Sequence, residues 1–158
     1  MKKIGAILFA IALSGCGTAI DMDGSVAVNT LVDWQSNSRA FIAGETVTLT
    51  SIVWINKMPS PDDDSVKAHA TLRLTSPSFI APETNILQVV IRQGNKQWDL
   101  TEEEYELRAD DSDSWEIAAA WNGELNHELP VDLAVEVSSI DTESKWLVQE
   151  SVNVDEVF

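Results

Sequence analysis

The six tryptophans are the strongest candidates for ligand chemistry, because an indole ring offers an apolar face for stacking together with an N–H donor. Their positions in the alternating strand pattern divide them into candidate ligand-binding residues and expected core residues. Trp54 shares a strand face with threonines and Trp98 lies in a short polar strand, which predicts a sugar-stacking platform. The competing interpretation is packing of both rings on a second sheet face beneath a loop. The other four fall on faces rich in Val and Ile and are expected in the core: Trp34, Trp115, Trp121 and Trp146.

Two groups of aspartates suggest a second kind of chemistry, calcium binding. Calcium takes about six to eight oxygen ligands, and the two groups together supply enough carboxylates if their loops meet. Neither group has the spacing of a helix–loop–helix calcium site, so the competing interpretation is a pair of solvated acidic loops. The candidate ligands are Asp62, Asp63, Asp64, Asp110, Asp111 and Asp113.

The sequence contains no recognisable catalytic motif. Its two histidines, His69 and His127, form no His-x-x-x-His pair, and neither a Gly-x-Ser-x-Gly elbow nor a phosphate-binding glycine loop occurs. His69 stands between Lys67 and Thr71 on the polar side of an alternating segment, which predicts a solvent-facing role. Carboxylates are too numerous to single out a pair. We therefore expect a protein that is not an enzyme and has no cofactor, calcium excepted.

The net charge of the chain disfavours some classes of binding partner. It carries 26 Asp and Glu against 10 Lys and Arg, a net charge of −16. Nucleic-acid binding needs clustered Lys and Arg, so we expect no nucleic-acid partner. An anionic lipid surface would repel the chain as well. Basic or cation-bridged partners stay compatible, and the plainest interpretation of the charge is a well-solvated surface.

The N-terminus has the pattern of a secretory signal peptide. Lys2 and Lys3 precede the apolar run 4–13, which is too short for a membrane-spanning helix of about 20 residues. A basic start, a short apolar core and an exit of small residues are typical of a cleaved signal. Cys16 follows directly and is the only cysteine, so the chain cannot form an internal disulfide.

The residues Leu13-Ser14-Gly15-Cys16 resemble the lipobox of bacterial lipoproteins. The resemblance implies that the Cys16 sulfur receives a diacylglycerol, that the signal is cut before it, and that the new amino group is acylated, for example with palmitate. An Asp after the cysteine would favour the inner membrane. Gly17 stands there instead, so the resemblance implies a lipid anchor in the outer membrane of the bacterial cell envelope. The alternative is an ordinary signal peptide with an unrelated cysteine.

These features divide the chain into three parts. Residues 1–15 are the expected signal peptide, residues 16–25 a lipidated N-terminus and small polar linker, and residues 26–158 one domain. Cleavage would remove Lys2 and Lys3 and leave 26 acidic residues against eight basic ones, a net charge of −18. An extended linker of this length reaches roughly 30 Å, at about 3.3 Å per residue, so the domain is expected near the membrane surface.

From Val26 onward, apolar and polar residues alternate with a period of two. Turn signals at 93–96 and at Asn122-Gly123 separate such segments. A Thr-x-x-Glu spacing at 101–104 fits one helical turn, and the residues after it fit a strand equally well. About eight short strands without a long helical period predict an all-β fold, an antiparallel β-sandwich, with a small β-barrel as the alternative. The expected strands are 26–34, 43–53, 66–74, 86–92, 97–100, 115–121, 131–137 and 146–154.

Three features resemble bacterial immunoglobulin-like modules. They are a Gly44-Glu45 turn leading into alternating Val, Thr and Leu, an acidic loop before Trp115, and two Val-rich strands that close the chain. The resemblance implies an immunoglobulin-like sandwich without the disulfide of antibody domains.

Two functional hypotheses follow. The first is a non-enzymatic, membrane-anchored module that holds another envelope protein or serves as a structural subunit. The second is a glycan- or peptidoglycan-binding module that uses Trp54 and Trp98.

Overall fold

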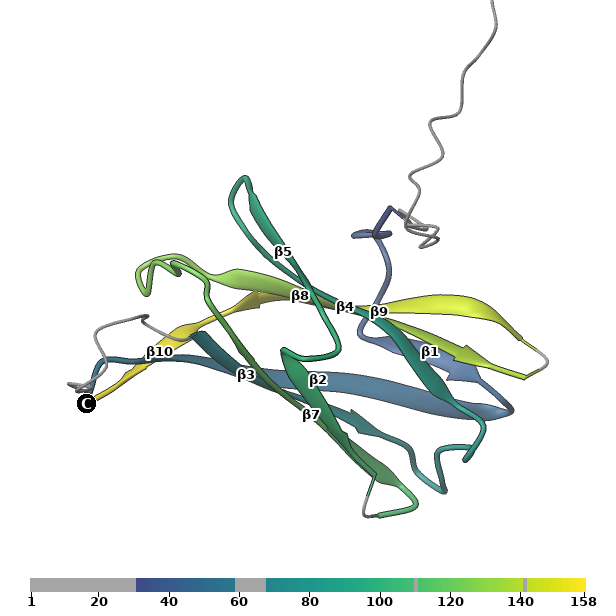
Figure 1. Ribbon diagram of the computed structural model, residues 1–158. Coiled ribbons are helices and arrows are strands. Elements are labelled where there is room, and N and C mark those ends of the chain that lie inside the picture. Colours follow the sequence, from purple (N-terminus) through teal and green to yellow (C-terminus); the bar gives the residue numbers. More distant parts are fainter. Residues whose placement is uncertain (1–30, 59–67, 110, 141) are drawn as a thin grey trace, which may run out of the picture. The chain divides into compact units, whose positions relative to one another are not determined.

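The alternating segments fold into strands, as the computed structural model shows for residues 31–58, 68–109, 111–140 and 142–158 (Figure 1). The lipobox, the linker and the start of the expected first strand lie outside these described residues. Within them there are ten strands: β1 (Arg39–Ile42), β2 (Glu45–Asn56), β3 (Ala68–Thr75), β4 (Asn85–Gln93), β5 (Lys96–Leu100), β6 (Tyr105–Arg108), β7 (Ser114–Trp121), β8 (Val131–Ser139), β9 (Thr142–Val152) and β10 (Val154–Val157).

The strands form two sheets. The first sheet runs β1-β2-β3-β7-β6, with β10 also paired to β2, and the second runs β5-β4-β8-β9. Every pairing among the described residues is antiparallel except β10 with β2, which is parallel. Figure 1 shows the two layers, with β2, β3 and β7 below β4, β8 and β9. The predicted β-sandwich is confirmed, and the β-barrel alternative is wrong because the sheets stay separate.

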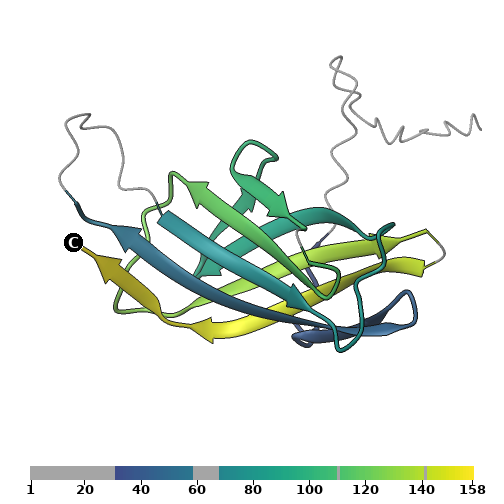
Figure 2. The same ribbon diagram turned by 90° about the horizontal axis from the view of Figure 1, so that it is seen from below.

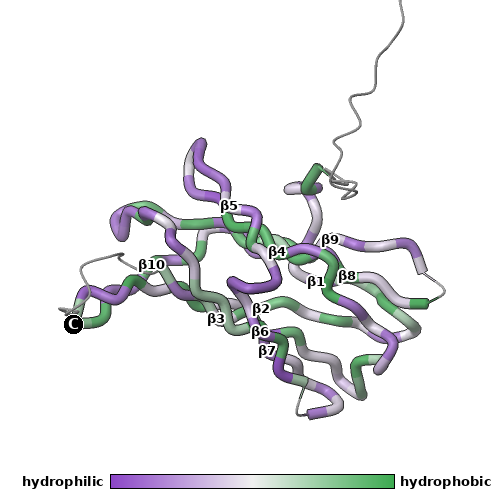
Figure 3. Tube along the Cα trace, in the orientation of Figure 1, coloured by the Kyte–Doolittle hydropathy of each residue, from purple (hydrophilic) through white to green (hydrophobic). Residues whose placement is uncertain are grey.

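One core fills the space between the sheets, and strand parity places its residues. In β2 the predicted inward set of Val47, Leu49 and Val53 is buried, while Thr46 and Thr50 face out. Apolar burial stabilises by roughly 25 cal/mol per Å², which favours this register over one slipped by a residue. Figure 3 shows the complementary pattern, with polar residues gathered at turns such as the β4–β5 hairpin. The largest fully buried side chains include Leu49, Leu72, Leu74, Ile91, Ile117, Leu133 and Leu147.

The predicted first strand is wrong where the structure describes it. Residues 31–38 form no strand, and β1 begins at Arg39, inside a stretch that looked turn-like. Asp33 is the reason: its carboxylate accepts hydrogen bonds from the Gln35 backbone N–H at 3.2 Å and from the Ser36 hydroxyl at 3.0 Å. Such local bonds compete with a strand ladder.

The last predicted strand is two strands in different sheets. β9 lies in the second sheet and β10 in the first, and the chain changes sheets after Ser151, whose φ is 57°. Trp146 and Val148 therefore face outward from the second sheet, whereas Val154 enters the main core. The one continuous strand predicted for residues 146–154 is wrong because an irregularity at Ser151 shifts the alternation and the chain then passes to the other sheet.

The two predicted glycine turns have different outcomes. Gly94 has a φ of 59° in the β4–β5 hairpin, as its turn signal predicts. Gly123 forms no hairpin, because β7 and β8 belong to different sheets. A Cβ at Gly123 would lie 2.2 Å from Nε1 of Trp121, so the glycine makes room for this core indole.

The segment 101–104 is a turn and not a helix. The Glu104 carboxylate accepts from the Thr101 backbone N–H at 2.9 Å, and the Glu104 N–H donates to the Thr101 carbonyl at 2.9 Å. This gives part of the capping-box geometry, but β6 follows at once.

Candidate functional site

The outer face of the first sheet is the surface best suited to binding. We call it the threonine face, because Thr residues of β2 and β3 make up much of its centre. In Figure 2, β2, β3 and β7 lie nearest the viewer with no described segment in front of them. Its residues are Thr46, Thr48, Thr50, Ile52 and Trp54 of β2, His69, Thr71, Arg73 and Thr75 of β3, Glu106 and Arg108 of β6, and Ser114, Glu116, Ala118 and Ala120 of β7.

Strand pairing positions the aromatic pair on this face. Trp54 lies directly opposite His69 in the β2–β3 ladder. Their rings stack, with centroids 5.4 Å apart and planes 9° from parallel. Cross-strand aromatic pairs stabilise a sheet by a few tenths of a kcal/mol to about 1 kcal/mol. One face of the Trp54 indole is thus covered by His69, and His69 is half-buried. The stack replaces the purely solvent-facing role predicted for this histidine.

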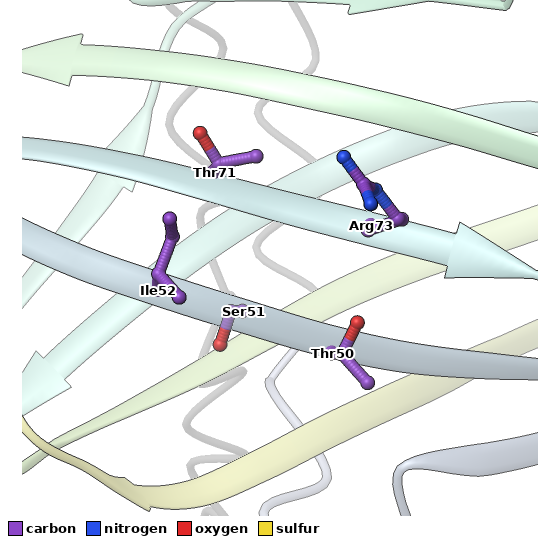
Figure 4. A pocket seen from close by; sticks show the side chains of 5 residues that line it. All are labelled: Thr50, Ser51, Ile52, Thr71 and Arg73. Carbon is purple, nitrogen blue, oxygen red and sulfur yellow. The ribbon is translucent and has the colours of Figure 1, made fainter.

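A shallow depression of about 180 Å³ lies beside the stack, between β2 and β3. Figure 4 shows its lining residues on the two neighbouring strands. Ile52 is 59% exposed there, although its neighbours Val53 and Ser51 turn inward or sit half-buried. An exposed isoleucine next to Thr71 and Thr50 gives the face a small apolar centre, with Arg73 as the one charged residue that lines the depression. Such a centre suits a protein partner, because interface cores are depleted of charged residues.

Charged residues on the threonine face neutralise one another. Arg73 pairs with Glu116 at 3.1 Å, and Arg108 pairs with both Glu116 at 3.2 Å and Glu106 at 3.1 Å. Two arginines and two glutamates leave the face with no net charge in a chain of net charge −16. The edge strands do not change this balance, because they add Arg39 of β1, opposite Thr48, and Asp155 of β10, opposite Trp54. Arg73, Arg108 and Glu116 border a second depression of about 370 Å³, which Asp111 also lines. The surface can therefore approach an acidic protein with little electrostatic repulsion.

The two tryptophans predicted as a sugar platform lie apart. Trp54 belongs to the outer face of the first sheet. Trp98 lies on the inner side of β5 in the second sheet, half-buried against the core and 6.4 Å from the Trp121 ring centroid. The structure does not bring them together.

The four tryptophans expected in the core divide evenly. Trp115 and Trp121 are buried in the core, as predicted. Trp34 and Trp146 are not in it. Both lie half-buried on the outer face of the second sheet, packed against a small cluster formed by Val90, Ala134 and Val148. That prediction is wrong for these two because residues 31–38 form no strand and the outer face of the second sheet carries its own apolar cluster.

The candidate calcium ligands lie mostly outside the described residues. Asp62, Asp63, Asp64 and Asp110 fall there, as does Cys16, the predicted lipidation site. Asp111 and Asp113 are described and exposed. The loop around them is tied to the neighbouring loop through backbone bonds, from Ser76 N–H to the Asp113 carbonyl at 2.9 Å and from Ile80 N–H to the Ser112 carbonyl at 2.6 Å. No metal-binding group of three or more His, Cys, Asp or Glu occurs among the described residues.

The sequence alone could not predict the whole threonine face, although it predicted one part of it. Thr46, Thr48 and Thr50 already mark an outward face. The residues that β6 and β7 add, including Ala118 and Ala120, depend on which strands are neighbours in the sheet. The alternation of polar and apolar residues along the chain does not predict that order. No helix in the described part of the chain is long and apolar enough to span a membrane. The chain matches no protein-family model, and no curated protein or solved structure matches it significantly.

Proposed function

We propose that this protein is a lipid-anchored module of the bacterial cell envelope that binds another envelope protein through the threonine face and catalyses no reaction. The observation that carries the proposal is a sheet face that none of residues 31–58, 68–109, 111–140 and 142–158 covers, with no net charge and an apolar centre, on a chain of net charge −16. Elsewhere the surface charge favours solvent, so this face is where a partner meets the least electrostatic cost.

The lipid anchor in this proposal is supported by the sequence alone. The lipobox ending at Cys16 supplies the acyl attachment, and several buried acyl chains hold firmly because each buried CH₂ contributes roughly 0.8 kcal/mol. A tether to the outer membrane restricts the module to partners close to that membrane. Growth with a labelled fatty acid should label the wild-type chain and leave the Cys16→Ser variant unlabelled. An unlabelled wild-type chain would remove the anchor from the proposal.

The geometry favours a protein partner over a small molecule on this face. Neither depression there is lined by an aromatic ring, and the arginines and Glu116 of the larger one already pair with one another, which leaves few groups for a small molecule to bind. A flat sheet with Thr, Ala and one exposed isoleucine can pack against an equally flat surface. The paired arginines and glutamates then form a polar rim on the β6–β7 side, as protein interfaces have.

Site-specific photo-crosslinking in intact cells tests the surface directly. A photoreactive amino acid at Thr50 should give one dominant protein adduct. The same group at Asn95, in the exposed β4–β5 turn of the other sheet, is the matched control and should not give this adduct. Adding Ile52→Lys to the Thr50 probe should reduce the adduct at least tenfold. Equal adducts at both positions, or none at Thr50, would refute the threonine face as the binding surface.

A further inference from the structure

A third depression, of about 350 Å³, lies where the two sheets meet at one edge of the sandwich. β1 of the first sheet and β9 of the second lie side by side there (Figure 1). We call it the Trp146 pocket and define it by Asp33, Asn37, Arg39, Ser144, Lys145 and Trp146. Its volume suits one sugar ring with its substituents, since small-ligand pockets begin near 300 Å³. Arg39 lies opposite Thr48 in the β1–β2 ladder, at the β1 edge of the first sheet's outer face, and none of the β2, β3, β6 and β7 residues that define the threonine face lines the pocket.

Backbone hydrogen bonds hold this edge of the sandwich together. The Val148 N–H of β9 donates to the Asn37 carbonyl at 3.0 Å, and the Leu49 N–H of β2 donates to the Ser38 carbonyl at 2.7 Å. The segment before β1 thus bridges a strand of each sheet. The pocket is therefore built on β1, β9 and a segment that is hydrogen-bonded to a strand of each sheet, which keeps its lining groups in place for a ligand.

Trp146 supplies an aromatic wall. It packs partly against the Val90, Ala134 and Val148 cluster, which fixes the indole, and it stays partly exposed where it lines the pocket. An indole held in this way can stack on the apolar face of a sugar ring and offers an N–H donor at its edge.

The polar lining has spare donors and no spare carboxylate. Arg39 makes no hydrogen bond or ion pair with any described residue, and Lys145 donates one hydrogen bond, to the Phe41 carbonyl at 2.8 Å. The Asp33 carboxylate already accepts from Gln35 and Ser36 within its own turn. Two cations and one internally satisfied acid leave the lining with a net charge of +1 on a chain of −16.

We propose that the Trp146 pocket binds a carboxylate-bearing sugar unit of a glycan. Arg39 and Lys145 pair with the sugar carboxylate, and the Asn37 carboxamide, which bonds to no described residue, takes a ring hydroxyl. The sugar ring stacks on Trp146. One negative charge on the sugar balances the +1 of the lining, and a guanidinium binds a carboxylate in a bidentate manner. The pocket is distinct from the threonine face, so the two proposals stand or fall separately.

Binding to defined saccharides tests the proposal on the mature full-length chain in detergent. Isothermal titration with tetragalacturonate should show binding at least tenfold tighter than with neutral cellotetraose. The peptide-free peptidoglycan disaccharide, whose N-acetylmuramic acid keeps a free lactyl carboxylate, tests the second source of such carboxylates. Tighter binding of that fragment than of tetragalacturonate would assign the site to cell-wall glycan, and the reverse order to acidic polysaccharide. Either order supports the pocket.

Two variants connect the binding to this pocket. Arg39→Met, at an exposed position, should weaken tetragalacturonate binding at least tenfold without a change in the unfolding midpoint. Trp146→Phe keeps a ring on the apolar cluster and should weaken binding about threefold. Arg73→Met on the threonine face is the matched control and should bind like the wild type. Equal affinity for acidic and neutral sugars, binding of an acidic peptide alone, no binding at all, or indifference to Arg39→Met would each overturn the proposal.

Discussion

The two outer faces of the sandwich differ in how they meet solvent. On the second sheet the chain closes its own face: Val32 and Trp34, from the segment before β1, pack over Val90 and Ala134. On the first sheet no segment that the structure describes covers the threonine face, and Ile52 at its centre is 59% exposed. The outer face of the second sheet is therefore packed against other parts of the domain, whereas the threonine face is exposed where the structure describes it.

The side chains beneath explain why only one face needs a cover. Val90, Ala134 and Val148 form an apolar patch on the second sheet that would be costly to leave in water, roughly 25 cal/mol per Å². The threonine face instead alternates hydroxyls and small side chains with neutralised ion pairs, and these are compatible with water. Surfaces that must stay soluble and still receive a partner commonly combine a small apolar centre with such a surround.

Trp34→Ala is expected to show the largest difference in stability between the two outer faces. The change removes the indole that covers the outer cluster and also its contact with Arg92, whose guanidinium carbon lies 3.9 Å from the ring centroid. We expect a loss of about 3 kcal/mol in the free energy of unfolding, measured by urea denaturation. Trp54→Ala on the threonine face is the matched control, with about 1 kcal/mol. Equal losses would mean that the two faces do not differ as described.

A smaller effect is expected from the coupling between Trp34 and Arg92. The Arg92 guanidinium pairs with the Asp132 carboxylate at 2.7 Å, which holds it beneath the indole. A double-mutant cycle with Trp34→Ala and Arg92→Met should give a coupling energy of about 1 kcal/mol, since partly buried cation–π contacts lie in this range. If the stability losses of the two single variants simply add, the contact of Arg92 with Trp34 contributes nothing, and only its ion pair with Asp132 remains.

Strand parity made part of this architecture predictable. The inward set of β2, from Val47 to Ile55, follows from alternation alone, because only one register buries Val and Leu together. The Gly94 hairpin was equally readable, since a local turn needs only local chemistry. Both features depend on residues that are close in sequence, and such features can be predicted from one sequence.

Other features depend on contacts between distant segments. Trp34 looked like a core residue because it alternates with apolar neighbours, yet the turn at Asp33 takes it out of any strand and places it over β4 and β8. Trp146 looked like core for the same reason, and the change of sheet at Ser151 breaks the face that it was expected to share. The Trp146 pocket combines residues about a hundred positions apart, so no local pattern predicts it.

The threonine face should tolerate charge with little loss of stability. Ile52→Lys places a cation at its exposed centre, where no apolar cluster is opened. We expect a change of no more than about 0.5 kcal/mol in the free energy of unfolding, because exposed substitutions rarely exceed this. Ala134→Lys, at the fully buried counterpart on the second sheet, is the control and should prevent stable folding. A loss above about 2 kcal/mol for Ile52→Lys would mean that the open face is structurally constrained.

The smallest effect concerns β10, the strand that extends the first sheet beside β2. Its Glu156 pairs with Lys57 and lies 3.2 Å from Nδ1 of His127. The hydrogen bond from Lys57 lowers the pKa of Glu156 below its usual range, and the charge of His127 acts in the same direction against desolvation. A carboxyl whose folded pKa is depressed stabilises the fold above its unfolded pKa, and this stabilisation is lost as the pH falls through the folded value.

Glu156→Gln should therefore reduce the stability slightly at pH 7, and this difference should shrink as the pH falls from 7 through the folded pKa of the carboxyl. Urea midpoints across this range measure the difference, with Glu150→Gln on exposed β9 as the matched control expected to show none. The effect is small because the ion pair is solvent-accessible and screened. A difference that grows toward low pH would reverse the sign of the linkage and would mean that Glu156 is held in its neutral form.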